Sequence, residues 1–220
     1  MFVGHFGVAF AAKRAAPQVS LGSLFFAAEF ADGLWPIFLL AGIEHARIVP
    51  GLMKTSALDL YDYPWSHSLL ALCVWSALVG AVYYAARRSR SGAWVLAVLV
   101  ISHWFLDAWA HRPDMPVFPR GPYVGLGLWN SLPSTLAVEG LLYIAGLAVY
   151  LRSTEPADRV GSWALWFLVI LLPVLWLASL FGPPPPSART LAISGLSGWL
   201  FIPWGYWIDR HRAPRIAVRA

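Results

Sequence analysis

GAWVLAVLVISHWFLDAWA, residues Gly92–Ala110, is an apolar segment interrupted only by a few polar side chains, His103 and Asp107 among them. It is long enough to cross a bilayer, which takes about 20 helical residues. His103 and Asp107 are four positions apart, so a helix places both on one face. Ionisable groups at membrane depth are costly and usually face a cavity, a partner or a metal ion. The pair therefore indicates either a cation site or a His–Asp hydrogen bond inside a helix bundle.

The remainder of the chain extends this pattern to a whole membrane domain. Hydrophobic residues make up 59% of it and charged residues 12%, compared with about 25% in soluble domains. Long continuous apolar runs do not alternate as the strands of a β-barrel do. The sequence predicts an all-α, polytopic helical membrane protein, with one integral membrane domain over residues 1–220, about six spanning helices and a short N-terminal helix at Phe2–Ala16. The predicted spans are Val19–Ile43, which contains the helix-disturbing Pro36, Ser66–Ala86, Gly92–Ala110, Pro133–Leu151, Val160–Phe181 and Thr190–Ile208.

Basic residues indicate the orientation of these spans. If the turn at Arg87–Arg90 faces the cytoplasm, eleven of the 16 lysines and arginines fall on the cytoplasmic side. They are Lys13, Arg14, Arg87, Arg88, Arg90, Arg152, Arg159, Arg210, Arg212, Arg215 and Arg219. The sequence therefore predicts a multi-pass protein with a cytoplasmic C-terminus. Arginines directly after a span are more often topology signals than nucleic-acid contacts, so no nucleic-acid partner is expected.

The depth of the polar residues can be estimated from the helical rise of about 1.5 Å per residue. Asp107 and Glu139 both come to roughly 20 Å above the cytoplasmic edge. His5 and Asp32 reach the same layer if their segments form an antiparallel pair. His67, at roughly 30 Å, fits this layer least well. The convergence predicts a metal site in the outer half of the membrane. Its predicted ligands are His5, Asp32, His67, His103 and Asp107.

Four short elements appear in a recognisable order along the first half of the chain. They read GHFG at Gly4–Gly7, ADGLWP at Ala31–Pro36, WSHS at Trp65–Ser68 and SHWFLD at Ser102–Asp107. In this order the chain resembles the predicted membrane-bound metal-dependent hydrolases of bacteria. The resemblance implies a divalent metal held by the histidines and aspartates of these elements, hydrolytic chemistry, and a location in the bacterial inner membrane.

Such a site would support a defined chemistry. A zinc-type ion with an open position lowers the pKa of bound water to about 7, which makes hydroxide available. Zinc is the expected metal, with manganese or iron left open, because the only cysteine, Cys73, lies within a span. Glu139 and Asp114 are the candidate catalytic residues, as proton acceptors for that water. The alternative for Glu139 is a hydrogen bond to a neighbouring span. Ser66 is expected either to orient the His67 ring or to cap a helix.

The sequence therefore predicts a membrane-embedded metal-dependent hydrolase. Its expected partner is membrane lipid, and its expected substrate, judged from the depth of the site, is a lipid or lipid-linked phosphoester. The alternative is a non-catalytic membrane protein, a transporter or an assembly factor, with a structural metal or a buried polar network. A transporter needs a polar path to the cytoplasm, and the inner halves of the predicted spans contain no ionisable residue.

Overall fold

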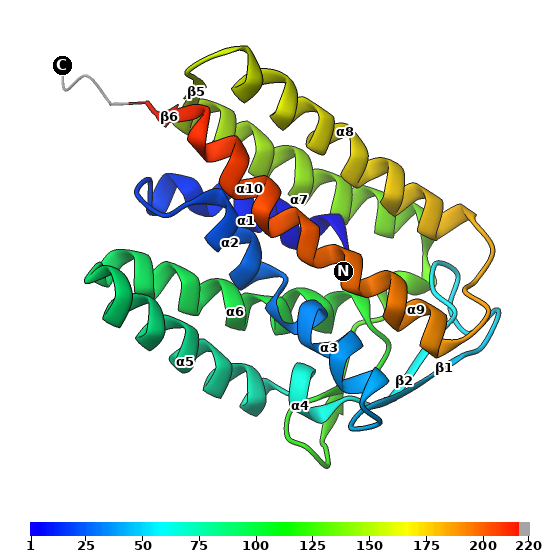
Figure 1. Cartoon of the computed structure of the whole chain (residues 1–220). Coiled ribbons are helices and arrows are strands. Elements are labelled where there is room, and N and C mark those ends of the chain that lie inside the picture. Colours follow the sequence, from blue (N-terminus) through cyan, green and yellow to red (C-terminus); the bar gives the residue numbers. More distant parts are fainter. Residues whose placement is uncertain (216–220) are drawn as a thin grey trace.

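The structure, a computed structural model, describes residues 1–215 and is built mainly from α-helices (Figure 1). Arg219 lies outside the described residues. The α-helices are α1 (Val3–Ala15), α2 (Leu21–Ala28), α3 (Phe30–Leu40), α4 (Pro64–His67), α5 (Leu69–Arg87), α6 (Arg90–Ala110), α7 (Leu132–Ser153), α8 (Arg159–Phe181), α9 (Ala188–Gly195) and α10 (Phe201–Arg210). Two short 3₁₀ helices are η1 (Leu128–Asn130) and η2 (Leu196–Leu200).

Short antiparallel strand pairs close several of the connections, which the all-α prediction did not include. They are β1 (His45–Ile48) with β2 (Leu58–Asp62), β3 (Met115–Pro116) with β4 (Tyr123–Val124), and β5 (Thr154–Pro156) with β6 (Arg212–Pro214). None of them exceeds five residues, so the prediction of a helical fold is confirmed.

Four helices, α5 to α8, are long and apolar enough to cross a bilayer, and α2 with α3 provides a fifth if the bent pair counts as one span. This architecture is compatible with a multi-pass membrane protein. Six continuous spans are not present among the described residues, because the segment predicted at Thr190–Ile208 is divided among α9, η2 and α10. Gly195 and Gly198 lie at this interruption, and glycine is a poor helix former.

The segment predicted as one span at Val19–Ile43 bends by 55° between α2 and α3. The break falls at Glu29, while Pro36 lies inside α3. Because α2 ends at Ala28, the carbonyl of Ala28 has no partner within its helix and is free to accept a hydrogen bond from elsewhere. The bend also turns Asp32, in the first turn of α3, toward the middle of the bundle.

Most of the basic turns gather at one end of the molecule, on the left in Figure 1, together with β5 and β6. Gln18, between α1 and α2, donates hydrogen bonds to Ser89 and Ser91 at the α5–α6 turn, over 3.3 and 2.8 Å. At the same end the ammonium of Lys13 is buried and lies 2.8 Å from Asp209 in α10. These contacts join α1, α2, α6 and α10 at the end opposite to the β1–β2 loop.

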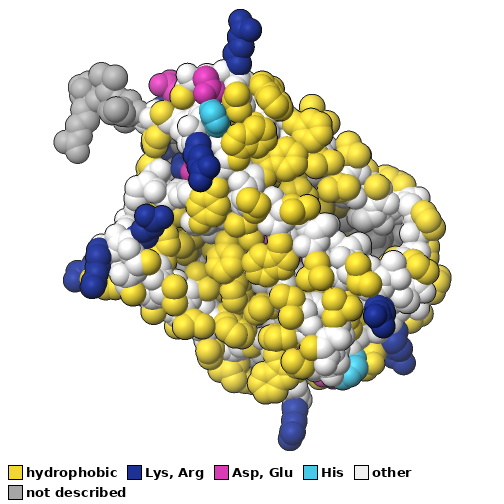
Figure 2. Space-filling view, viewed as in Figure 1, with side chains coloured by type: hydrophobic (Ala, Val, Ile, Leu, Met, Phe, Trp, Pro, Cys, Tyr) yellow, Lys and Arg dark blue, Asp and Glu magenta, His cyan; other side chains and the backbone are white. Residues whose placement is uncertain are grey.

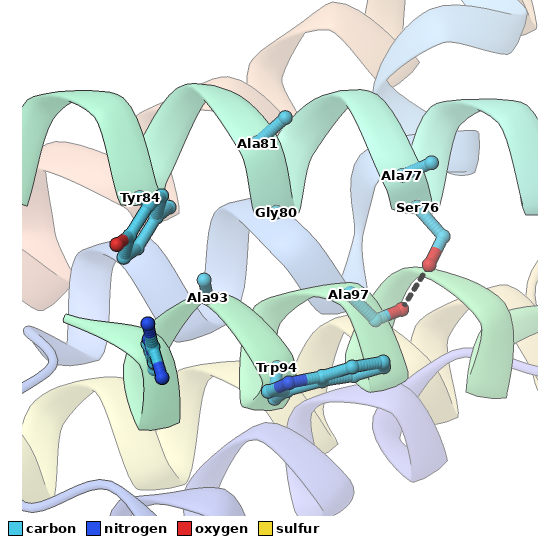
Figure 3. Close-up of a pocket in the computed structure, with 9 residues that line it drawn as sticks. Ser76, Ala77, Gly80, Ala81, Tyr84, Ala93, Trp94 and Ala97 are labelled. Carbon is cyan, nitrogen blue, oxygen red and sulfur yellow. Dashed lines mark hydrogen bonds between the residues drawn. The ribbon is translucent and has the colours of Figure 1, made fainter. Parts of the chain in front are cut away.

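A shallow hollow lies between α5 and α6, lined by small residues such as Ala77, Gly80, Ala93 and Ala97 (Figure 3). Ser76 donates a hydrogen bond across it to the carbonyl of Ala97, over 2.7 Å. Its other lining residues include Tyr84, Arg90 and Trp94.

Close helix packing positions α1 against α7. A methyl group on Gly146 would overlap the carbonyl oxygen of Gly7, and one on Gly7 would overlap the backbone at Leu142. α2 and α10 meet in the same way at Gly22 and Gly205. Glycine allows the backbones to approach, as small residues do between membrane helices. The α1–α7 contact brings the start of α1 beside Glu139 of α7.

Gly146→Ala is therefore expected to lower the free energy of unfolding by about 1–3 kcal/mol, because α1 and α7 must separate to admit the methyl group. Gly140→Ala, on the same helix, is the matched control, since its methyl group would meet only one atom of Trp176 at 4.0 Å. That change is expected to be neutral or stabilising by up to about 1 kcal/mol. Denaturant titration in detergent, followed by tryptophan fluorescence, measures both. Equal effects of the two substitutions would contradict this packing.

Candidate functional site

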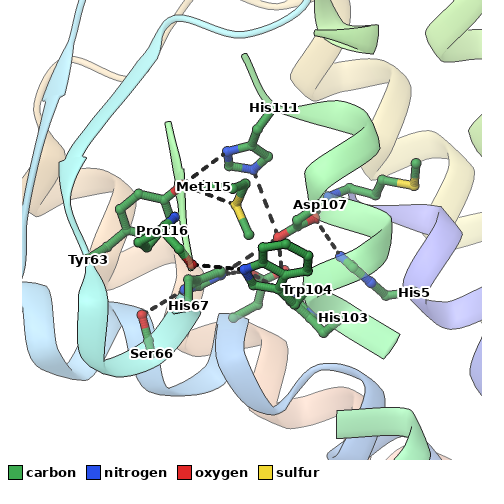
Figure 4. A network of polar contacts seen from close by, with 12 residues as sticks. His5, Tyr63, Ser66, His67, His103, Trp104, Asp107, His111, Met115 and Pro116 are labelled. Carbon is green, nitrogen blue, oxygen red and sulfur yellow. Dashed lines mark hydrogen bonds and ion pairs between the residues drawn. The ribbon is translucent and has the colours of Figure 1, made fainter. Parts of the chain in front are cut away.

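A cluster of histidines and aspartates lies where α1, α3, α4 and α6 meet, and Figure 4 shows most of its members. The structure brings together all five residues predicted as metal ligands. His5 comes from α1, Asp32 from α3, His67 from α4, and His103 and Asp107 from α6. Except for Asp32, whose side chain is 39% exposed, their side chains are buried.

Four ligand atoms form the centre of the cluster. The Oδ1 atom of Asp32 lies 3.3 Å from Nε2 of His67 and 3.7 Å from Nε2 of His103. The Oδ2 atom of Asp107 lies 3.2 Å from Nε2 of His103 and 3.8 Å from Nε2 of His67. Zinc–ligand bonds of about 2.0–2.1 Å give tetrahedral ligands a mutual separation of about 3.4 Å. These distances are near that value, and the ligand atoms of Asp32, His67 and His103 all lie within 4.8 Å of one another, so these three residues form one candidate group for a divalent ion, with Asp107 adjoining it through His103.

The hydrogen bonds on the outer side of each ring assign its tautomer. Nδ1 of His103 lies 2.8 Å from the carbonyl oxygen of Ala28, which can only accept, so Nδ1 carries the hydrogen. Nδ1 of His67 lies 2.7 Å from Oγ of Ser66, whose own hydrogen is donated to Glu44 over 2.6 Å. Nδ1 of His67 therefore also carries a hydrogen. In a neutral ring, both Nε2 atoms then present lone pairs to the cluster.

His111, directly after α6, is a further histidine beside His67 and His103, and the sequence analysis assigned it no role. Its Nδ1 lies 3.2 Å from Asp114, which is held in turn by Nε of Arg112 over 2.9 Å. Its Nε2 faces Oδ2 of Asp107 at 3.8 Å. The ring packs against Trp129, with centroids 4.5 Å apart, and against Tyr63. Its position four residues after Asp107 was the available signal.

Burial raises the pKa of the Tyr63 hydroxyl well above its ordinary value, so this group remains a donor. It donates to the backbone carbonyl of Asp114 over 3.1 Å. Tyr63 precedes α4, so this bond ties the His67 helix to the loop that carries His111.

This arrangement brings acceptors together. When both rings are neutral, the Nε2 lone pairs of His67 and His103 point toward the carboxylate oxygens of Asp32 and Asp107, and Nε2 of His103 is buried without a hydrogen-bond partner among residues 1–215. Acceptors facing one another in a buried site repel unless a cation or proton lies between them. The donor set, two imidazoles and two carboxylates, is one that zinc and related divalent ions take.

The other oxygen of Asp107 has a different environment. Its Oδ1 lies 3.0 Å from Nε2 of His5 and contacts the amino group of Met1. The ring of His5 is stacked in parallel on that of His103, with centroids 3.8 Å apart. Ligand atoms of His5, His103 and Asp107 lie within 4.8 Å of one another, so His5 adjoins the central four atoms from the opposite side of the carboxylate.

Of the two candidate catalytic residues, only Glu139 lines the cavity beside the cluster. Both of its oxygens accept hydrogen bonds, from the amide of Phe2 over 2.7 Å and from Trp129 over 3.3 Å. Asp114 is instead occupied by Arg112 and His111. Glu29, which the sequence analysis did not select, also lines the cavity, and its Oε1 is buried with no partner in residues 1–215.

The depth estimated for His67 from the helical rise was too close to the membrane boundary and too far from the other predicted ligands. The predicted span Ser66–Ala86 is interrupted at Ser68, whose side chain caps α5 by accepting from the amide of Ala71. His67 therefore belongs to the separate short helix α4, which packs against α3 and turns the ring inward.

A cavity of about 650 Å³ opens onto the cluster, and Figure 2 shows a hollow on the side of the molecule where the α8–α9 connection lies. Its polar end carries Asp32, His67 and Asp107. Its walls are mostly apolar and include aromatic side chains from several segments: Phe2, Phe6, Phe26, Trp35, Trp129, Trp176, Trp199 and Phe201. Among the described residues that line it, only Lys54 carries a fixed positive side-chain charge. The cavity is amphipathic, with a ligating end and an apolar wall.

Comparisons of the chain with known protein families, with curated proteins and with solved structures give no match.

Proposed function

We propose that this protein is a membrane-embedded metal-dependent hydrolase whose divalent ion, zinc in first place, is held by Asp32, His67, His103 and Asp107. The observation that carries the proposal is the group of imidazole lone pairs directed at two carboxylates. The net charge of these four residues with neutral rings is two negative charges, which one divalent ion balances. His5 and His111 contact the two oxygens of Asp107 and would adjoin such an ion.

Catalysis, rather than a purely structural metal, is supported by the open side of the site. Asp32 is 39% exposed toward a cavity large enough for a substrate, whereas a structural zinc site is closed. When bound, the ion would supply an activated water and polarise a phosphoryl oxygen. Glu29, with its unpartnered buried oxygen, is the better-placed proton acceptor, and Glu139 is the second.

The proposed substrate is a lipid or lipid-linked phosphoester. Aromatic walls favour an acyl or prenyl chain, because burying apolar surface is favourable by roughly 25 cal/mol per Å². The phosphate would lie at the polar end beside the metal ligands, in a cavity that Lys54 also lines. We place the protein in a bacterial inner membrane with the basic turns and the C-terminus in the cytoplasm, and hence the cluster toward the outer side.

Purified without chelators, the protein is expected to hold at least one divalent ion per chain by mass spectrometry. His103→Ala and Asp107→Ala remove central ligands and should lose most of it. His45→Ala is the matched control, because His45 is exposed and pairs only with Asp62 at 2.8 Å among its described ionic contacts. Metal content well below one ion, or content unchanged in both ligand variants, would count decisively against the proposed centre.

The proposed orientation can be tested with single cysteines in a Cys73→Ser background. Cysteines placed within residues 121–130 should react with a membrane-impermeant thiol reagent in intact cells, because this loop lies at the end away from the basic turns. Cysteines near Arg88 or Arg212 should react only after the cells are opened. The reverse labelling pattern would overturn both the topology and the placement of the site.

Asp107→Asn keeps the shape of the side chain but removes the anionic ligand. Turnover of phospholipids or polyprenyl phosphates in nanodiscs should fall at least about 100-fold, since each 1.4 kcal/mol of lost transition-state stabilisation is about tenfold. Asp62→Asn changes an exposed carboxylate that pairs with His45 and not with the cluster, and should leave turnover unchanged. A wild-type rate matched by Asp107→Asn would refute the catalytic role. Bound metal without any turnover would favour the structural alternative.

A further inference from the structure

Glu44 is a fully buried carboxylate in the connection between α3 and β1, outside the predicted ligand set. Its Oε1 accepts hydrogen bonds from the amides of Trp65 and Ser66, over 2.7 and 2.8 Å. Its Oε2 accepts from the hydroxyl of Ser66 over 2.6 Å. Two of these bonds satisfy backbone donors in the first turn of α4, and the third goes to a side chain that capping does not require.

That third bond fixes a direction for the hydrogens. A serine hydroxyl has one hydrogen, and here Glu44 takes it. Ser66 Oγ can therefore only accept from Nδ1 of His67, 2.7 Å away. His67 therefore donates a hydrogen bond to Ser66, and Ser66 donates one to Glu44. In the neutral ring, Nε2 of His67 carries no hydrogen and faces Asp32 and Asp107.

We infer that Glu44 is a positioning residue that holds His67, through Ser66, in the tautomer that binds the metal. The inference rests on the proposed metal centre but not on hydrolysis. A ligating histidine whose second nitrogen is held by a carboxylate is a recurrent arrangement in metal sites, and loss of such outer partners costs 10- to 100-fold in metal affinity. Here a serine hydroxyl is inserted between the carboxylate and the ring.

Glu44→Gln reverses the polarity of this chain. The amide oxygen of glutamine would satisfy the two backbone donors, which leaves the NH₂ group facing Ser66. Because this group donates to Oγ, the serine hydrogen turns toward Nδ1 of His67. This arrangement favours the tautomer of His67 that carries its hydrogen on Nε2, which offers no lone pair to a metal ion.

Zinc affinity of the full-length protein, measured by competition with a chromophoric chelator, tests this inference. Glu44→Gln should weaken binding by about 10- to 100-fold. Ser66→Ala should weaken it less, because it removes the link without reversing it. The double variant with Glu44→Gln and Ser66→Ala should bind zinc as strongly as Ser66→Ala alone. Adding Ser66→Ala to Glu44→Gln should therefore restore part of the lost affinity. Ser187→Ala is the matched control, because Ser187 is an exposed cap of α9 that accepts from the amide of Thr190, outside the cluster, and this change should leave affinity unchanged.

A role in capping alone predicts a different pattern. Glu44→Gln and Ser66→Ala would then lower stability additively, and the double variant would be the weakest binder, which would overturn the inference. Nitrogen-15 NMR of the histidines in metal-free protein gives an independent measurement, in which His67 should carry its hydrogen on Nδ1 in the wild type and on Nε2 in Glu44→Gln. The same tautomer in both would overturn it as well. Wild-type protein that shows the expected tautomers but binds no zinc would instead refute the proposed function.

Discussion

Two carboxylates, those of Asp32 and Asp107, are held within 3.8 Å of imidazole nitrogens that, in neutral rings, carry no hydrogen. Burying such acceptors against one another is expensive, and the cost rises in the low dielectric of a membrane domain. A divalent ion converts the repulsion into attraction. On this view one cation links side chains from α1, α3, α4 and α6. The packing of these helices holds the side chains of four separate segments close to one another.

The contacts of the outer ring nitrogens of His103, His67 and His111 share a structural origin, since each partner lies at or beside a helix end. His103 donates to the last carbonyl of α2 and His67 to the serine of the one-turn helix α4, and Nδ1 of His111 lies 3.2 Å from Asp114 just beyond α6. Helix ends leave backbone groups without intrahelical partners, and side chains collect there to satisfy them. The bend at Glu29 and the break at Ser68 therefore supply the polar groups that a continuous apolar span lacks.

Much of this arrangement could be predicted from the sequence. α5 to α8 follow from the length and continuity of their apolar runs, and His5, Asp32 and Asp107 were predicted to lie together because a fixed helical rise converts sequence position into depth. The same assumption failed at His67, where the helix is interrupted, and at Thr190–Ile208, where glycines permit a 3₁₀ segment. Glu29 and Glu44 could not be selected, because their roles depend on which partners tertiary folding leaves free or brings near.

The position of the cluster at the end of an aromatic cavity limits what the proposed enzyme can bind well. A small soluble phosphate would meet the ligands but leave the cavity walls, Trp176 and Trp199 among them, in contact with water. An apolar chain alone would fill the walls but leave Asp32 and any bound ion without a partner. Only a molecule with both parts satisfies both ends of the cavity, since unmatched polar groups and uncovered apolar surface each reduce affinity. That requirement selects amphiphiles, which a membrane supplies laterally at high local concentration.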